Sequence, residues 1–412
     1  MERFELGENI PKMNHLSRVA VIGAGAGGLC TASRFKQLGI EKIKIFESAS
    51  RLGGTWRYVD DPNDDPCSSM YKNLLTNLPT KVMNYPDFPF PEDTDAFPSH
   101  TVILKYLKDY AKRQNLSEHI SFNDPVESCS FEKKECTWKV NEESFDFVVV
   151  ANGHYTKPSI PDIFKSSSFQ GQIMHTHYYR KAESLARKNV LVIGQGPSGQ
   201  DISLDLLGIA NSVALLGRSE IKGTPDSLRK FIGWAKEVKP NGVLTNNGDL
   251  IECDYILLAS GYCFDFPFLE ENVIEYSPCR KKIQPLYKQI IHSHFPSLAF
   301  IGIPCTIVPF PLMDCQAQWL GQVWKGNVTL PPTEERLKQA AIIPGIGRPE
   351  IDRHFHKMSN AQWKYDDDLA NEANFEPIPR SIQDLYTQVW GVRSEKGPAV
   401  FRNVQYKDYY DY

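Results

Sequence analysis

The first chemically informative residues are glycines spaced so that the backbone can hold a phosphate group. Gly23, Gly25 and Gly28 fit the pattern G-x-G-x-x-G, with Gly27 just before the last position, and they follow the apolar, β-branched stretch 18–22. In this pattern the first glycine permits a tight turn, the second lets the backbone approach a pyrophosphate, and the third lets helix and strand pack closely. The following helix would offer free N–H groups and a partial positive charge to the phosphate.

An acidic residue completes this pattern further along the chain. Residues 29–38 are predicted to form a helix that Gly39 ends, and residues 42–46 form a second strand. Glu47 follows that strand, 19 positions beyond Gly28, where a carboxylate can accept a hydrogen bond from a ribose 2′-hydroxyl. Glycines alone would also suit an ordinary turn, but the full order of elements predicts a dinucleotide-binding unit.

The same glycine pattern occurs a second time in the middle of the chain. An apolar strand predicted at residues 189–193 leads into Gly194, Gly196 and Gly199, and residues 200–207 are predicted to continue as a helix. Two dinucleotide-binding units are therefore expected in one chain.

The two copies differ at the position that reads the ribose. Arg218 stands 19 positions beyond Gly199, where the first copy has an acid. Arginine offers a fork of donors that suits a 2′-phosphate, whereas an acid would repel that group. A solvated surface arginine is the alternative interpretation. The difference predicts FAD in the first unit and NADPH in the second, a pair of cofactors that serves hydride transfer to flavin.

The repeat predicts an α/β fold with two nested Rossmann-like dinucleotide-binding domains. Both copies close in a triplet of small residues, Ala-Asn-Gly at 151–153 and Ala-Ser-Gly at 259–261, and residues 121–140 are predicted to form a hairpin. The predicted domains are residues 1–164 as the first part of the FAD-binding domain, 165–261 as the inserted NADPH-binding domain, and 262–412 as the second part of the FAD-binding domain with a C-terminal helical region.

Composition excludes several classes of protein. The net charge of −4, with no basic cluster, gives no reason to expect nucleic acid as a partner. No run of 18 apolar residues exists and the N-terminal stretch lacks an apolar signal core, so no integral membrane segment is expected. Nine cysteines without a C-x-x-C pair or a metal-site spacing favour free thiols and no bound metal. We expect a soluble, cytoplasmic protein; secretion after removal of a leader and assembly into a homo-oligomer stay open.

A further motif lies before the second glycine turn. Phe169, Gly171, His175 and Tyr179 fit F-x-G-x-x-x-H-x-x-x-Y, the signature of the flavin-containing monooxygenases. With the two glycine turns, the loop 53–56 and the triplet at 259–261, the resemblance to that family extends over roughly residues 19–330. Within the family the chain resembles the soluble insect members, which include pyrrolizidine-alkaloid N-oxygenases.

The resemblance implies roles for particular residues. Asn77 is expected to be catalytic, because the matching amide of the family supports the oxygenated flavin, and Thr76 and Leu78 flank it as cofactor contacts. Gln316 resembles a position that contacts the isoalloxazine ring, and His175 is expected to bridge the domains rather than to act as a base. The other expected contacts are Gly23, Gly25, Gly27, Gly28, Glu47, Gly54, Thr55 and Trp56 for FAD, and Gly194, Gly196, Ser198, Gly199, Gln200, Asp201 and Arg218 for NADPH.

The resemblance also implies a reaction. NADPH reduces the flavin, O₂ adds to form a C4a-hydroperoxyflavin, and a soft nitrogen or sulfur nucleophile attacks the distal oxygen. The expected substrate is a small lipophilic tertiary amine such as an alkaloid, or a thioether. The alternatives are a Baeyer–Villiger monooxygenase, whose signature ends in Trp where this chain has Tyr179, and a catalytically idle FAD- and NADPH-binding protein that senses redox state. A disulfide reductase is disfavoured because the chain has no redox C-x-x-C pair.

Overall fold

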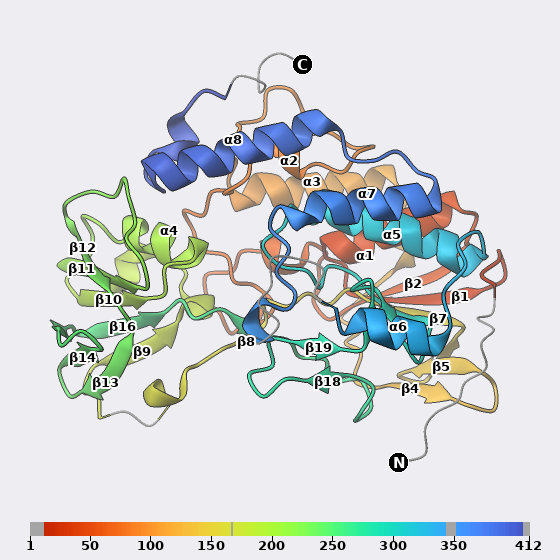
Figure 1. Ribbon diagram of the computed structural model, residues 1–412, viewed down its shortest axis with the longest axis horizontal. Helices are drawn as coiled ribbons and strands as arrows, with labels where there is room; N and C mark the ends of the chain where they lie inside the picture. Colours follow the sequence, from red (N-terminus) through yellow and green to blue (C-terminus); the bar gives the residue numbers. More distant parts are fainter. Residues whose placement is uncertain (1–11, 166–167, 343–351, 407–412) are drawn as a thin grey trace.

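The two glycine turns lie on two separate sheets, which stand at opposite sides of the molecule in Figure 1. The computed structural model describes residues 12–165, 168–342 and 352–406. The larger sheet has the strand order β20-β21-β22-β7-β1-β2-β3, and the smaller one has the order β12-β11-β10-β16-β9. All strands of the smaller sheet lie between β7 and β22 in sequence, so one unit is inserted into the other, and the fold has the predicted α/β class.

The larger sheet is buried on both faces because apolar residues alternate between two cores. Val19 and Val21 of β1 belong to one hydrophobic cluster, while Ala20 and Ile22 belong to the other. Its central strands run parallel, and β20 and β21 join antiparallel at one edge. The strands are β1 (Arg18–Ile22), β2 (Lys42–Glu47), β3 (Ile120–Phe122), β7 (Phe147–Val150), β20 (Leu286–Tyr287), β21 (Ile291–His292) and β22 (Leu298–Phe300).

The smaller sheet is parallel throughout and is also covered on both faces. Helix α4 (Pro197–Asp205) packs on one face, where Ile202 joins Val190 and Val192 in one cluster. A three-stranded antiparallel sheet covers the other face, and sequence periodicity did not predict it. The strands are β9 (Gln172–His175), β10 (Asn189–Ile193), β11 (Ser212–Gly217), β12 (Leu228–Ile232) and β16 (Tyr255–Leu258), with β13 (Ala235–Lys239), β14 (Gly242–Thr245) and β15 (Leu250–Glu252) in the covering sheet.

One predicted hairpin is partly wrong. Residues 121–140 do not form a single hairpin, because β3 pairs parallel with β2, with Ile120 opposite Ile45. Ile120 is nearly buried there, so packing against the larger sheet takes this stretch out of the hairpin. The antiparallel strands are instead β4 (Cys129–Glu132), β5 (Thr137–Val140) and β6 (Glu143–Phe145).

Two connections join the units, and they pair with each other. The outgoing connection contains β8 (Lys157–Pro158) and the returning one contains β17 (Tyr262–Cys263), which lie antiparallel. The returning chain then forms β18 (Glu275–Tyr276) and β19 (Ile283–Gln284). This paired link sets where the smaller sheet stands relative to the larger one.

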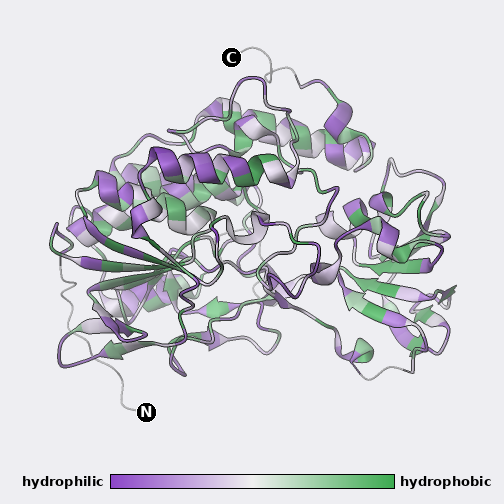
Figure 2. Cartoon of the chain, turned by 180° about the vertical axis from the view of Figure 1, so that it is seen from behind, coloured by the Kyte–Doolittle hydropathy of each residue, from purple (hydrophilic) through white to green (hydrophobic). Residues whose placement is uncertain are grey.

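Helices cover the upper side of the larger sheet in Figure 1. Hydrophobic residues concentrate on the strands of both sheets, and hydrophilic residues colour the outer turns of the helices (Figure 2). Among the described residues, no helix combines the length and apolar character needed to cross a membrane. The helices are α1 (Ala26–Gln37), α2 (Thr80–Met83), α3 (His100–Arg113), α5 (Pro309–Lys325), α6 (Thr333–Ala340), α7 (Ala361–Ala373) and α8 (Arg380–Lys396).

Candidate cofactor and active site

The first glycine turn needs glycine at its two ends. Gly23 has a φ of +109°, and a Cβ atom there would lie 2.6 Å from the carbonyl oxygen of Ala151 at the end of β7. A Cβ on Gly28 would lie 1.8 Å from the carbonyl oxygen of Gly23. The turn is therefore closed against its own strand and against the neighbouring strand, which holds the start of α1 at the carboxyl end of the sheet.

The second glycine turn repeats these contacts. Gly194 has a φ of +112°, and its Cβ would lie 2.4 Å from the carbonyl oxygen of Ala259 at the end of β16. A Cβ on Gly199 would lie 1.8 Å from the carbonyl oxygen of Gly194. The first residue of each small-residue triplet, Ala151 or Ala259, therefore packs directly against the first glycine of the corresponding turn.

The middle glycines differ from the outer ones. A Cβ on Gly196 would meet no atom within 4 Å, and one on Gly25 would lie 3.5 Å from the Cα atom of Gly54. Gly27 faces the core instead, because its Cβ would lie 3.2 Å from Ile301 Cγ2. Gly25 and Gly196 are the N-caps of α1 and α4, and neither carries a side-chain cap. Uncapped N–H groups at a helix start suit a phosphate, and at Gly196 the space beside them is open.

Glu47 lies buried beside the first turn. Its Oε2 accepts a hydrogen bond from the Ala24 N–H at 3.0 Å, and its Oε1 accepts one from the Ala49 N–H at 2.9 Å. Arg57, which is fully buried, forms an ion pair with Glu47 at 3.2 Å and with Asp65 at 2.6 Å. Oε1 is occupied by the Ala49 N–H and the Arg57 guanidinium, whereas Oε2 accepts from the Ala24 N–H and keeps a second lone pair for a ribose hydroxyl. No sequence pattern pointed to Arg57, because the fold of the loop brings its partners Glu47 and Asp65 to it.

The loop that begins at Gly53 faces the same turn. Gly54 lies opposite Gly25, Thr55 Oγ1 lies 3.0 Å from Ser69 Oγ, and Trp56 contacts Phe310 at the start of α5, edge to face. These residues form η1 (Gly54–Trp56), which has no fully buried member. Trp56 therefore packs against the core on one side and is partly exposed on the other.

Thr76, Asn77 and Leu78 form a short stretch before α2. Thr76 is buried and its Oγ1 has no partner, while Leu78 packs in the core. The half-buried Asn77 amide also makes no hydrogen bond to any residue that the structure describes. An orphaned hydroxyl next to a free amide is unusual inside a protein and suits a bound group.

Gln316 on α5 has a different environment. It is completely buried, its Oε1 accepts from the Gly302 N–H at 2.9 Å, and its Nε2 donates to Tyr365 Oη at 2.8 Å. Both ends of its amide are therefore engaged with protein, and Gln316 fixes the turn at Gly302, which follows β22. Its predicted contact with the isoalloxazine ring stays a prediction.

The predicted NADPH residues gather at the start of α4. Ser198 is exposed, Gln200 Nε2 donates to the Gln195 carbonyl at 2.8 Å, and Asp201 forms an ion pair with Arg402 at 2.7 Å. Gln195 also accepts from the Ser219 N–H at 3.0 Å, so the turn is tied to the residue after Arg218.

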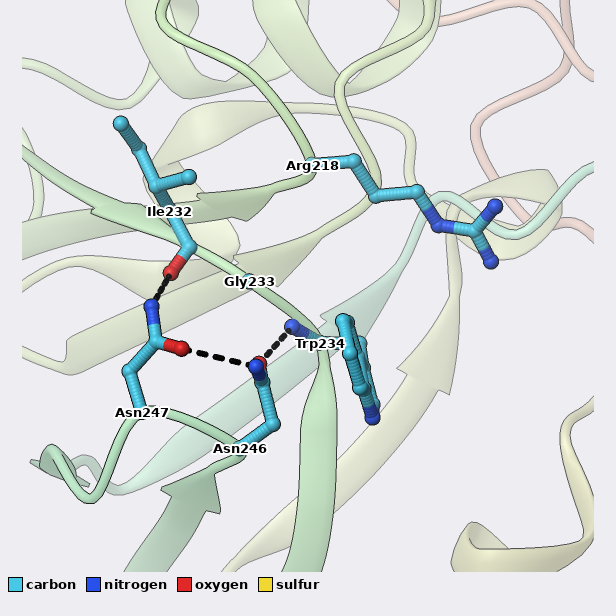
Figure 3. A pocket seen from close by; sticks show the side chains of 6 residues that line it. All are labelled: Arg218, Ile232, Gly233, Trp234, Asn246 and Asn247. Carbon is cyan, nitrogen blue, oxygen red and sulfur yellow. Dashed lines mark hydrogen bonds between the residues drawn. The ribbon is translucent and has the colours of Figure 1, made fainter.

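Arg218 lines a pocket of about 510 Å³ with Ile232, Gly233, Trp234, Asn246 and Asn247 (Figure 3). The arginine is exposed and has no hydrogen bond or ion pair within the described ranges. Trp234 is 59% exposed, and its backbone N–H donates to Asn246 Oδ1 at 2.8 Å. Trp234 lies just before β13, and the two asparagines lie in the turn between β14 and β15. The sequence interpretation missed all three because it did not predict this antiparallel sheet.

The signature residues His175 and Tyr179 make their side-chain hydrogen bonds within residues 165–261. His175 Nδ1 accepts from the His177 N–H at 3.0 Å, which leaves Nε2 to donate to the Gly261 carbonyl at 3.0 Å. Burial lowers the pKa of His175 to about 4, so it is neutral near pH 7. Tyr179 Oη donates to Asp205 Oδ2 at 2.5 Å. These hydrogen bonds tie segments of the second unit to one another, and the predicted role of His175 as a bridge between the domains stays a prediction.

The sequence matches a family model described as flavin-binding monooxygenase-like over residues 16–223 and 230–377. Two flavin-containing monooxygenases of Arabidopsis thaliana, FMO GS-OX-like 5 and FMO GS-OX-like 4, are each 32% identical to the chain. The first alignment covers 95% of this chain and 94% of the relative, and the second covers 93% of both.

Solved structures give the same answer. S-allyl-L-cysteine S-oxygenase from Allium sativum has a TM-score of 0.85 and 32% identity, covering 95% of this chain and 96% of that chain. Tmm from Pelagibacter sp. has a TM-score of 0.83 and 25% identity, covering 95% and 94%. Cyclohexanone monooxygenase shares the fold, with a TM-score of 0.63 at 16% identity. The chain therefore belongs to the family of flavin-binding monooxygenases that its motifs indicate.

Proposed function

We propose that this protein is an NADPH- and O₂-dependent FAD monooxygenase that oxygenates a nitrogen or sulfur atom of a small lipophilic substrate. Residues 1–164 and 262–412 would hold FAD, and residues 165–261 would hold NADPH. The observation that carries the proposal is the pair of matching glycine turns, each with an uncapped helix N-terminus, beside the free amide of Asn77.

The first unit fits FAD at several points. The N–H groups at the start of α1 would face the pyrophosphate, with Gly25 and Gly54 leaving room for it. Glu47, held in place by Arg57, would accept a hydrogen bond from the ribose. Trp56 would contact the flavin from η1, and Gln316 would act on the ring through the Gly302 turn that it fixes.

The second unit fits NADPH. Gly194, Gly196, Ser198 and Gly199 would surround the pyrophosphate at the start of α4. The guanidinium of Arg218 would pair with the 2′-phosphate, because a forked donor matches a phosphate and no residue that the structure describes competes for it. Trp234 would give the adenine an aromatic surface within the same pocket.

The bound flavin would supply the redox chemistry, taking a hydride from NADPH and activating O₂ for transfer of one oxygen atom. The protein then has three tasks, which are to orient the two cofactors, to exclude water and to stabilise the oxygenated state. The Asn77 amide has a free N–H donor for the last task. No strong acid or base is required, which agrees with the neutral, structural role of His175.

We propose tertiary amines, with alkaloids first, as the substrates to test, and thioethers second because the similar Allium sativum protein is an S-oxygenase. The test is product analysis by mass spectrometry with panels of amines, sulfides and ketones, in the presence of NADPH and O₂. We expect N-oxides or S-oxides. Esters or lactones from ketones, with no oxide from any amine or sulfide, would favour the Baeyer–Villiger alternative instead.

A second measurement distinguishes the monooxygenase from the catalytically idle alternative. A catalytically idle redox sensor would bind FAD but would not consume NADPH faster when an amine or sulfide is added. Oxygen-electrode and NADPH-absorbance traces with and without substrate distinguish the two, because the monooxygenase consumes both reagents in step with product.

A further inference from the structure

The C-terminal part of the chain reaches across both units, and one arginine there contacts each of them. Helix α8 leads into η7 (Phe401–Asn403), and we call residues 380–403 the C-terminal bridge. In Figure 1 this bridge runs along the top of the molecule, from the helices over the larger sheet to the side of α4.

Arg402 makes the contact to the FAD side. Its Nε donates to the Thr76 carbonyl oxygen at 2.8 Å, and Nη2 lies 3.4 Å from the Leu75 carbonyl oxygen. The Thr76 carbonyl belongs to the peptide bond that joins Thr76 to Asn77. A fixed Thr76 carbonyl therefore fixes the peptide plane at the start of Asn77.

The same guanidinium makes the contact to the NADPH side. Its Nη2 lies 2.7 Å and its Nη1 3.4 Å from the two carboxylate oxygens of Asp201, and both side chains are largely buried, at 17% and 13% exposed. Asp201 stands on α4, whose first turn carries the predicted pyrophosphate contacts. Because a helix is rigid over a single turn, fixing Asp201 also fixes that turn.

Neighbouring contacts support the same arrangement. Arg393 on α8 is buried and donates to Gln200 Oε1 at 3.1 Å, next to Asp201. A Cβ on Gly223 would lie 1.7 Å from the Lys396 carbonyl oxygen, so the end of α8 lies directly on the loop that follows Arg218. One turn further along α4, Asp205 accepts hydrogen bonds from Asn73 and Tyr179.

We infer that Arg402 is a positioning residue that sets the separation between Asn77 and the NADPH-phosphate turn by binding both at once. This inference rests on the proposed function, since that separation decides how the nicotinamide meets the flavin. The guanidinium suits the task because its planar fork donates in several fixed directions, which a lysine ammonium cannot match.

The test compares Arg402→Ala, Arg402→Lys and the control Arg380→Ala in the purified full-length protein. Arg380 also pairs with an aspartate, Asp384, but this pair is exposed and lies within α8, so it contacts neither residues 74–78 nor α4. The first readout is hydrogen–deuterium exchange of residues 74–78 and 196–205, which needs no turnover. The second is the rate of flavin reduction at saturating NADPH, measured together with the melting temperature.

We expect Arg402→Ala to raise exchange in both segments and to slow flavin reduction about 10- to 100-fold, because small displacements of reacting groups have effects of that size. Arg402→Lys should keep the pair with Asp201 and lose the fork, so exchange should rise at residues 74–78 and stay low at 196–205. Arg380→Ala should leave exchange and reduction unchanged.

Exchange in Arg402→Ala that equals that of Arg380→Ala in both segments would overturn the inference. So would a folded Arg402→Lys protein with unchanged exchange at residues 74–78. A parent protein that never reduces flavin with NADPH would count against the proposed function, whereas the exchange data would still decide the role of Arg402.

Discussion

At the scale of single residues, the two units are told apart by one position at the end of a strand. Glu47 is buried and held by backbone N–H groups and Arg57, whereas Arg218 is exposed and free of partners in the described structure. A held acid suits a neutral ribose hydroxyl, and a free guanidinium suits an anion. The charge at this position should therefore decide which nicotinamide cofactor the second unit prefers.

Arg218→Ala should raise the KM for NADPH about 10- to 100-fold and leave the KM for NADH nearly unchanged, because only NADPH loses a charge-assisted contact. Steady-state kinetics with both cofactors measure this. Arg229→Ala is the matched control, since that exposed arginine lies over the Phe231 ring at 5.3 Å and does not line the pocket. An equal loss for both cofactors would mean that Arg218 does not meet the 2′-phosphate.

Asn77→Asp should leave the rate of flavin reduction by NADPH within about twofold and lower the yield of oxygenated product about 100-fold, because a carboxylate lacks the amide N–H donor. NADPH would still be consumed, with H₂O₂ released in place of product. Parallel assays of NADPH, H₂O₂ and product measure which fraction of the consumed NADPH yields product and which fraction yields H₂O₂. If this variant still forms one product molecule for each NADPH consumed, Asn77 does not have the proposed catalytic role.

At the scale of elements, each turn is closed by the same pair of close approaches between backbone segments. A Cβ atom on Gly28 or on Gly199 would lie only 1.8 Å from the carbonyl oxygen of the first glycine of its own turn. Any side chain at these positions must push the helix away from its strand, which displaces the helix N-terminus that would face the phosphate. A substitution in one turn should therefore weaken binding of the cofactor at that turn and leave the cofactor at the other turn bound.

Gly28→Ala should give a protein with little bound flavin, while Gly199→Ala should keep its yellow flavin but be reduced poorly by NADPH. Each overpacked turn should also cost about 1–3 kcal/mol of stability. Flavin content by absorbance, NADPH titration and melting temperature measure the three effects. Gly391→Ala on α8 is the control, because a Cβ there meets no atom within 4 Å. Equal loss of flavin in both turn variants would contradict separate sites.

At the scale of the whole molecule, the larger sheet, the paired link of β8 and β17 and the C-terminal bridge hold the units in one arrangement. Buried histidines hold segments together inside each unit. His175 bridges β9 to Gly261, His292 Nε2 lies 2.6 Å from the Val273 carbonyl, and His356 Nε2 accepts from the Ile283 N–H at 3.0 Å. Burial lowers the pKa of His175 to about 4, and those of His292 and His356 to about 3.

These lowered pKa values predict acid sensitivity. The unfolded chain takes up protons near the ordinary histidine pKa of about 6.5, before the folded protein does. Stability from these groups is therefore complete above about pH 6.5 and is lost as pH falls toward 4, by roughly 1.4 kcal/mol per pH unit for each histidine.

Melting temperatures between pH 7.5 and pH 4.5 should fall steeply below about pH 6.5. His292→Asn removes one titrating group and keeps a donor and an acceptor, so it should flatten the slope by the share of one histidine, roughly 1.4 kcal/mol per pH unit. A slope identical to that of the parent protein would show that His292 does not titrate in this window.

The sequence by itself determined both glycine turns, the strands and helices around them, and Glu47 and Arg218 at the strand ends. These features could be predicted because they are local, since glycine spacing and apolar periodicity act between residues close together in the chain. The α/β class followed from the repetition of that local pattern. The short strand β3 was misjudged because three residues carry too little periodicity to show whether they pair with a hairpin or with a distant sheet.

Only the tertiary structure decided which groups meet at the site. Arg402 lies 326 positions from Thr76 and 201 from Asp201. Trp234 reaches the Arg218 pocket from the segment between β12 and β13, which the sequence pattern did not predict. Arg57 closes on Glu47 through a loop fold that spacing does not specify. Such contacts depend on how the chain packs in three dimensions, where hydrogen bonding and burial act between segments whose sequence separation carries no information.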